Sequence, residues 1–168
     1  MAQFTSAVYQ NEFLPDGGTD VNAIVTVHCT EAGSAGRTGS GSAGEIIVVD
    51  TSGSMGHANM QAAKQAAMIA LDNILDGTYF AVVAGNHKAY LAYPMVQSGA
   101  GMILMDARTR AEAKHAISYF RAEGGTAMGT WLNLCKALFD SIGNLANKHV
   151  ILLTDGENHN ETPQQLDA

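Results

Sequence analysis

The chain has 168 residues, of which 46% are hydrophobic, so it is long and apolar enough for one domain with a buried core. Its formal net charge is −7 and its nine Lys and Arg residues are scattered, which argues against nucleic-acid binding because that function needs a clustered basic surface. No run approaches membrane-spanning length and the polar start lacks the features of a signal peptide, so we expect no membrane insertion and, by default, a cytoplasmic location.

The first thirty residues have the pattern of a small β-rich appendage. Residues 4–14 and 18–30 have the composition of strands, with a Pro-Asp-Gly-Gly turn between them. Residues 31–44 are rich in glycine and serine, which is typical of a flexible linker. A formal G-x-G-x-x-G lies at 39–44, but it precedes a strand instead of following one, so it does not indicate a dinucleotide site. We expect three parts: an appendage at 1–30, a linker at 31–44 and the main domain at 45–168.

From residue 45 the apolar pattern alternates between strand and helix periods. The run at 46–49 is continuous, as in a central parallel strand that is buried on both faces. The elements expected after it are a helix at 58–75, a hairpin of strands at 79–84 and 89–95, helices at 109–119 and 128–142, and a buried strand at 149–154. This order predicts an α/β fold with a doubly wound, mainly parallel sheet flanked by helices.

The helices carry local signals that can be checked. Thr109 and Glu112 have the spacing of a capping box, which would make Thr109 the N-cap of its helix. The apolar faces of the first and last helices are predicted to contain Met60, Ala63, Ala67, Leu71, Ile74 and Leu75, and Trp131, Leu132, Cys135, Leu138 and Phe139.

The segment after the first buried strand has the pattern of half a metal site. Asp50, Ser52 and Ser54 form D-x-S-x-S, and Gly53 and Gly56 let the chain fold back so that these short side chains can converge. Oxygen ligands of this kind suit magnesium, manganese or calcium better than zinc or copper.

Two later segments supply further oxygen ligands. Thr126 lies in a Gly-Gly-Thr loop, and Asp155 follows another apolar strand in Thr-Asp-Gly. In doubly wound sheets ligands bind at the carboxyl ends of strands where the winding reverses, and Asp50 and Asp155 both fall at such ends. The sequence therefore predicts one site built from Asp50, Ser52, Ser54, Thr126 and Asp155.

D-x-S-x-S, then G-G-T, then T-D-G after a strand resembles the metal-ion-dependent adhesion site of the von Willebrand factor A family, in its stand-alone bacterial form. The resemblance covers roughly residues 45–160. It implies that Ser52, Ser54 and Thr126 contact the ion directly or through water, and that Asp50 and Asp155 act largely through water. It also implies a vacant or water-filled position on the cation, Mg²⁺ first among the expected ions, that an Asp or Glu carboxylate of a protein partner can fill.

Other readings of these residues are weaker. Any one of the five alone would be an ordinary cap or turn residue, but five in register make that reading unconvincing. The G-x-S-x-G elbow of hydrolases is absent around Ser54 and Ser52. An aspartyl phosphatase-like enzyme of the haloacid dehalogenase type also begins at a strand-end aspartate, yet Ser52 stands where that loop has its acid-base aspartate. We therefore expect no catalysis.

The remaining reactive side chains are interpreted as structural. Cys29 and Cys135 have no spacing motif, which favours free buried thiols. His57 and His159 follow the metal-loop segments and could stand at the rim of the site.

The end of the chain departs from the family pattern. Relatives continue with roughly two more helix and strand units, whereas thirteen residues follow Asp155 here. We expect the C-terminal part of the sheet to be missing and the strand that carries Asp155 to expose an apolar edge, completed by a companion chain or by further sequence. The function expected is metal-dependent protein binding; the alternative is a structural assembly module in which the metal only orders the loops.

Overall fold

The computed structural model describes residues 3–10, 23–30, 42–95 and 101–156. The chain divides into two compact units, Met1–Ser40 and Gly41–Ala168. In the first unit, β1 (Gln3–Gln10) pairs antiparallel with β2 (Ala23–Thr30), with Gln3 opposite Thr30. Two strands were expected here, and the turn predicted between them and most of the predicted linker lie outside the described residues.

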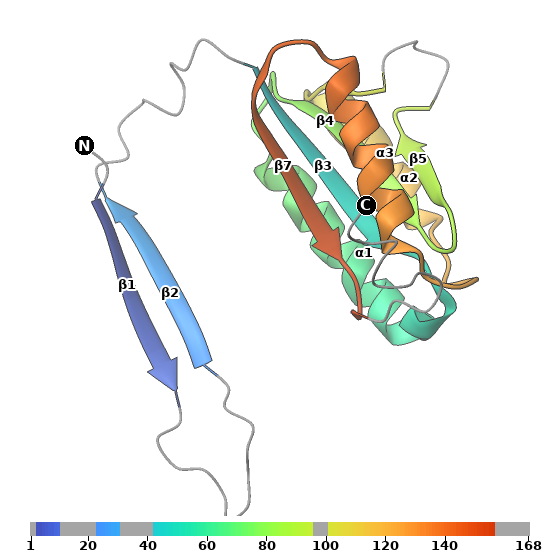
Figure 1. Cartoon of the computed structure of the whole chain (residues 1–168), viewed down its shortest axis with the longest axis horizontal. Helices are drawn as coiled ribbons and strands as arrows, with labels where there is room; N and C mark the ends of the chain where they lie inside the picture. Colours follow the sequence, from blue (N-terminus) through green and yellow to red (C-terminus); the bar gives the residue numbers. More distant parts are fainter. Residues whose placement is uncertain (1–2, 11–22, 31–41, 96–100, 157–168) are drawn as a thin grey trace, which may run out of the picture. The chain divides into compact units, whose positions relative to one another are not determined.

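The second unit contains a five-stranded sheet in the order β5-β4-β3-β7, with β6 also paired to β4 (Figure 1). Its strands are β3 (Ser42–Asp50), β4 (Tyr79–Gly85), β5 (Ala89–Tyr93), β6 (Ile103–Leu104) and β7 (Leu145–Leu153). The central strand β3 runs parallel to both β4 and β7, whereas β5 and β6 are antiparallel to β4. The α/β fold with a mainly parallel sheet is therefore confirmed.

Helices cover both faces of this sheet. Ile47 and Val49 of β3 share a core cluster with residues of α1 (Gly56–Asn73) and α2 (Ala107–Ser118). Ile46 and Val48 share the other cluster with residues of α3 (Met128–Ser141). Successive side chains of a strand point to opposite faces, so α1 and α2 pack on one face and α3 on the other. All four of these β3 side chains are fully buried, as the continuous apolar run predicts.

Three local predictions are wrong. The N-cap of α2 is Asp106, and Thr109 is the third helical residue: the Thr109 N–H donates to Asp106 Oδ1 at 2.7 Å, and the Asp106 N–H donates to the Thr109 hydroxyl at 2.8 Å. Leu75 is 69% exposed because it follows the C-cap Ile74, where the backbone has left the helix. Leu132 is 50% exposed because one helical step turns it about 100° away from buried Trp131.

The start of β3, the start of β7 and the burial of β7 also differ from the prediction. β3 begins at Ser42, three residues before the predicted domain start, and β7 begins at Leu145. β7 is half exposed, not buried on both faces, because it is the outermost strand on its side of the described sheet; Leu152 is 37% exposed. A companion chain or further sequence beside β7 stays a prediction. Within the ranges described, no helix is long and apolar enough to cross a membrane.

The end of β4 depends on the absence of a side chain at Gly85. A Cβ there would lie 2.4 Å from the ring of fully buried Trp131, so Gly85→Ala should lower the free energy of unfolding by about 1–3 kcal/mol through overpacking. Urea denaturation measures the change. Gly143→Ala is the matched control, because a Cβ at that position meets nothing within 4 Å. Equal stability of Gly85→Ala and the control would show that Trp131 can move aside at no cost.

Candidate metal centre

The centre is organised around the carboxylate of Asp50, the last residue of β3, which is fully buried. Its Oδ1 accepts a hydrogen bond from the Ser52 backbone N–H at 2.8 Å. Its Oδ2 accepts one from the Thr154 hydroxyl at 2.7 Å. Both oxygens are thus held in place, and each retains a lone pair for another partner.

Two hydroxyls lie beside this carboxylate. Ser52 Oγ and Ser54 Oγ are 2.9 Å apart, with Ser52 buried and Ser54 exposed. The chain turns sharply here because η2 (Gly53–Met55) is a single 3-10 turn that leads into α1. The D-x-S-x-S segment therefore brings two serine oxygens together. A joint site of all five predicted residues stays a prediction.

The loop that carries Thr126 is fastened to the same segment by two backbone hydrogen bonds. The Gly53 N–H donates to Gly124 O at 2.8 Å, and the Glu123 N–H donates to Thr51 O at 2.7 Å. Thr126 is fully buried. The loop conformation requires glycine at position 124, where φ is +78° and a Cβ would lie 2.6 Å from His87 Nδ1.

Thr154, the residue before Asp155, is hydrogen-bonded to the Asp50 carboxylate. β7 lies next to β3 in parallel register up to Leu153, which pairs with Val49, so Thr154 follows directly beside Asp50. The Thr154 hydroxyl accepts from the Gly156 N–H at 3.0 Å while it donates to Asp50. The side chain of Asp155 itself is exposed. Asp50 at the end of β3 and Asp155 just after β7 thus belong to the ends of neighbouring strands.

Sequence reasoning missed two residues. Thr154 stands inside the T-D-G motif, so its position gave a signal, but only the aspartate was assigned a role. Asn86 follows β4 and is 5% exposed; its carbonyl accepts from the Ala127 N–H at 3.0 Å and from Trp131 Nε1 at 2.7 Å. Asn86 thereby fixes the start of α3 just after Thr126. No local sequence pattern marks a residue that acts through its backbone carbonyl, because every residue has one.

The predicted ligand set would suit a hard cation. Its five residues carry two carboxylates and three hydroxyls, all oxygen: Asp50, Ser52, Ser54, Thr126 and Asp155. Throughout the described part of the chain no three His, Cys, Asp or Glu side chains gather as a metal-binding group. A site with these residues would thus depend on neutral hydroxyls, which fits Mg²⁺ or Mn²⁺ better than a thiolate- or imidazole-seeking metal.

Comparison with known proteins identifies the class of protein to which this chain belongs. The model of the von Willebrand factor type A domain matches residues 46–157, so the chain belongs to the von Willebrand factor type A domain family. A solved structure described as von Willebrand factor type A from Catenulispora acidiphila is similar to the chain, with 40% identity and a TM-score of 0.71, over 98% of this chain and 36% of that one.

Two more distant relatives are informative. "Uncharacterized protein sll0103" of a Synechocystis strain is 32% identical over 117 residues, which cover 67% of this chain and 24% of that protein. Proximal thread matrix protein 1 from the mussel byssus, in a structure described as having a zinc-occupied MIDAS motif, is 22% identical with a TM-score of 0.52, over 73% of this chain and 33% of that one. The chain thus spans about a quarter to a third of the relatives it matches.

The hydrogen bond between Thr154 and Asp50 can be tested by itself. Thr154→Val keeps the shape of the side chain but leaves one oxygen of a buried carboxylate without its donor, so the free energy of unfolding should fall by about 1.5–3 kcal/mol. Thr154→Ser retains a hydroxyl and should recover most of the loss. Urea unfolding in metal-free buffer at neutral pH measures both variants. A valine variant as stable as the wild type would mean that this bond does not hold the two strand ends together.

Proposed function

We propose that this chain is a protein-binding module that recognises its partner through a divalent cation. Asp50, Ser52, Ser54, Thr126 and Asp155 would hold the ion, and an Asp or Glu carboxylate of the partner would occupy the coordination position that they leave open. The observation that carries the proposal is the fixed, fully buried Asp50 carboxylate with a pair of serine hydroxyls 2.9 Å apart beside it.

The donor set explains why a cation here would bind a further acidic group. Three of the five ligands are neutral hydroxyls, so the ion keeps much of its positive charge. Mg²⁺ is usually bound through one or two carboxylates and keeps several exchangeable waters, one of which a partner carboxylate can replace. We therefore propose Mg²⁺ as the ion, with Mn²⁺ or Ca²⁺ as substitutes.

The similar proteins support this proposal indirectly. The mussel protein is described with zinc in the same kind of motif. A domain of the pilus tip protein Mfa5 from Porphyromonas gingivalis has a similar fold, with 19% identity and a TM-score of 0.57 over 74% of this chain. The first is named a thread matrix protein and the second a pilus tip protein, which is consistent with a role in binding other proteins.

Two other functions remain to be separated from this one. In a structural assembly module the metal would order the loops while recognition occurs elsewhere, for instance through β1 and β2. Partner binding would then survive removal of the metal. An aspartyl phosphatase would use Asp50 as a nucleophile, but both of its oxygens accept hydrogen bonds and Ser52 cannot act as the general acid.

Metal binding should stabilise the fold through Asp50. At a Mg²⁺ concentration of a hundred times Kd the gain in the free energy of unfolding is about 2.7 kcal/mol, so the melting temperature should rise clearly. Asp50→Ala should remove most of this rise, and Ser54→Ala, which alters an exposed hydroxyl, should reduce it. Asp140→Ala on α3 is the control acid outside the centre. Calorimetry that gives Asp50→Ala the metal affinity of the wild type would refute the assignment.

Partner binding should depend on the ion and on Thr126. A protein captured by the chain in Mg²⁺ should elute in chelator, and Thr126→Ala should fail to capture it while still unfolding cooperatively. Thr126→Ser, which keeps the hydroxyl, should bind. Isothermal titration with the purified partner quantifies the loss. A partner held equally well in chelator would favour the structural assembly module.

A further inference from the structure

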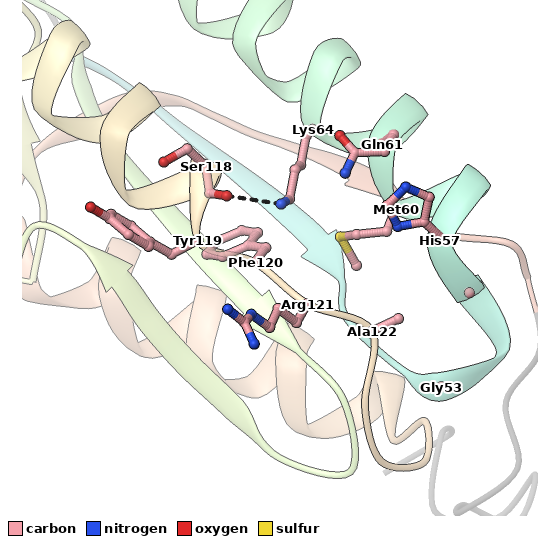
Figure 2. Close-up of a pocket in the computed structure, with 11 residues that line it drawn as sticks. Gly53, His57, Met60, Gln61, Lys64, Ser118, Tyr119, Phe120, Arg121 and Ala122 are labelled. Atoms are coloured by element: carbon pink, nitrogen blue, oxygen red, sulfur yellow. Dashed lines mark hydrogen bonds between the residues drawn. The ribbon is translucent and has the colours of Figure 1, made fainter.

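A second recognition element lies directly beside the proposed metal centre. A pocket of about 530 Å³ runs from Gly53 of the D-x-S-x-S turn along α1 to Lys64, and its other wall is formed by residues 118–122 (Figure 2). We call it the basic pocket, after His57, Lys64 and Arg121, which line it. It shares Gly53 with the metal loop, so the two sites are continuous.

The charges of this pocket differ from those of the rest of the chain. Eight of the nine Lys and Arg residues lie in the described ranges, and five of them form ion pairs with carboxylates: Arg108, Arg110, Lys114, Lys136 and Lys148. The three that form none with described residues are Lys64, Lys88 and Arg121, and two of these line the basic pocket. Among the residues that the structure describes, no Asp or Glu lines it.

The two cations line the pocket from different segments of the chain. Lys64 is half-buried and its Nζ donates to the Ser118 carbonyl at 2.8 Å, which fixes the ammonium on the wall opposite its own helix. An ammonium has three donors, so this bond leaves two for a ligand. Arg121 comes from the facing segment and offers a planar fork that suits a carboxylate. Buried Met60 and half-buried Phe120 add apolar walls.

Resting on the proposed function, we propose that the basic pocket binds a second carboxylate of the same partner segment, whose first carboxylate binds the metal. The partner is then an acidic peptide segment with two separated Asp or Glu residues. Lys64 lies eight positions after Gly56, the first residue of α1, or about 12 Å along the helix axis. An extended segment advances ~3.3 Å per residue, so the two acidic residues are separated by about four positions.

Peptide selection tests this without a known partner. A phage-displayed library of random linear peptides is panned on the full chain in Mg²⁺ and eluted with chelator. Peptides selected on the wild type should carry two acidic residues about four positions apart, the separation expected above. Those selected on the Lys64→Gln, Arg121→Gln double variant should keep one. For a selected synthetic peptide, each single variant should weaken binding roughly five-fold, and added salt should shrink that difference. Lys88 is the third cation that forms no ion pair with a described carboxylate, and Lys88→Gln should leave affinity unchanged.

The outcomes separate this inference from the proposed function. If no peptide elutes with chelator, metal-mediated binding itself is wrong. If eluted peptides carry a single acidic residue, or if the second one persists on the double variant, the metal site stands and the basic pocket proposal is overturned. It is also overturned if inorganic phosphate raises the melting temperature through Lys64 while selected peptides show no second acid, because the pocket then holds a small anion.

Discussion

The candidate metal centre depends on how the lost hydration of one buried carboxylate is compensated. Removing an ionised carboxylate from water is costly unless hydrogen bonds replace its hydration. Asp50 receives these bonds from the Ser52 N–H within its own loop and from the Thr154 hydroxyl at the end of the neighbouring strand. The same two bonds that make the burial of Asp50 tolerable therefore fix the position of the serine hydroxyls relative to β7.

The parallel arrangement of β3, β4 and β7 makes this compensation possible. In a parallel sheet the carboxyl ends of neighbouring strands meet at one edge, so residues that follow different strands can share a site. Asp50 and Thr154 follow β3 and β7, and Asn86 follows β4 on the other side. The backbone bonds of Gly53 and Glu123 then bring the Thr126 loop to the same edge. Four chain segments thus converge at this edge of the sheet.

Sequence patterns located this edge because its elements have strong local signals. The apolar run before Asp50 and the period of α1 and α3 are properties of the residues themselves, so strand, helix and strand end could be predicted. The predictions that were wrong concern features that depend on contacts with other elements of the fold. Asp106 and Thr109 are both residue types that can cap a helix, so the local sequence does not distinguish them. In the structure α2 begins soon after β6, and Asp106 is its N-cap. The half exposure of β7 depends on what lies beyond it in the sheet, and no local pattern contains that information.

The same distinction applies to the site. Asp50, Ser52 and Ser54 are neighbours in the chain, so their spacing alone indicates that their oxygens can meet. The roles of Thr154, Asn86 and the basic pocket arise between segments far apart in sequence: Lys64 and Ser118 are 54 residues apart, and Trp131 and Asn86 are 45 apart. From the sequence, a lysine that lines a pocket looks the same as an ordinary surface lysine of a helix. Only the fold shows whether a carboxylate lies close enough to form an ion pair with it.

Charge balance connects the metal centre to the basic pocket. A chain with a net charge of −7 repels an acidic partner at long range, so recognition of carboxylates requires a local reversal of sign. A divalent cation on neutral hydroxyls would supply most of that reversal. Lys64 and Arg121, which form no ion pair with a described carboxylate, would extend it into the basic pocket. Without the ion, buried Asp50 and exposed Asp155 would leave this end of the sheet negatively charged. Under the proposed function the metal would act twice: it would coordinate one carboxylate, and it would cancel the repulsion that would keep the second from reaching the pocket.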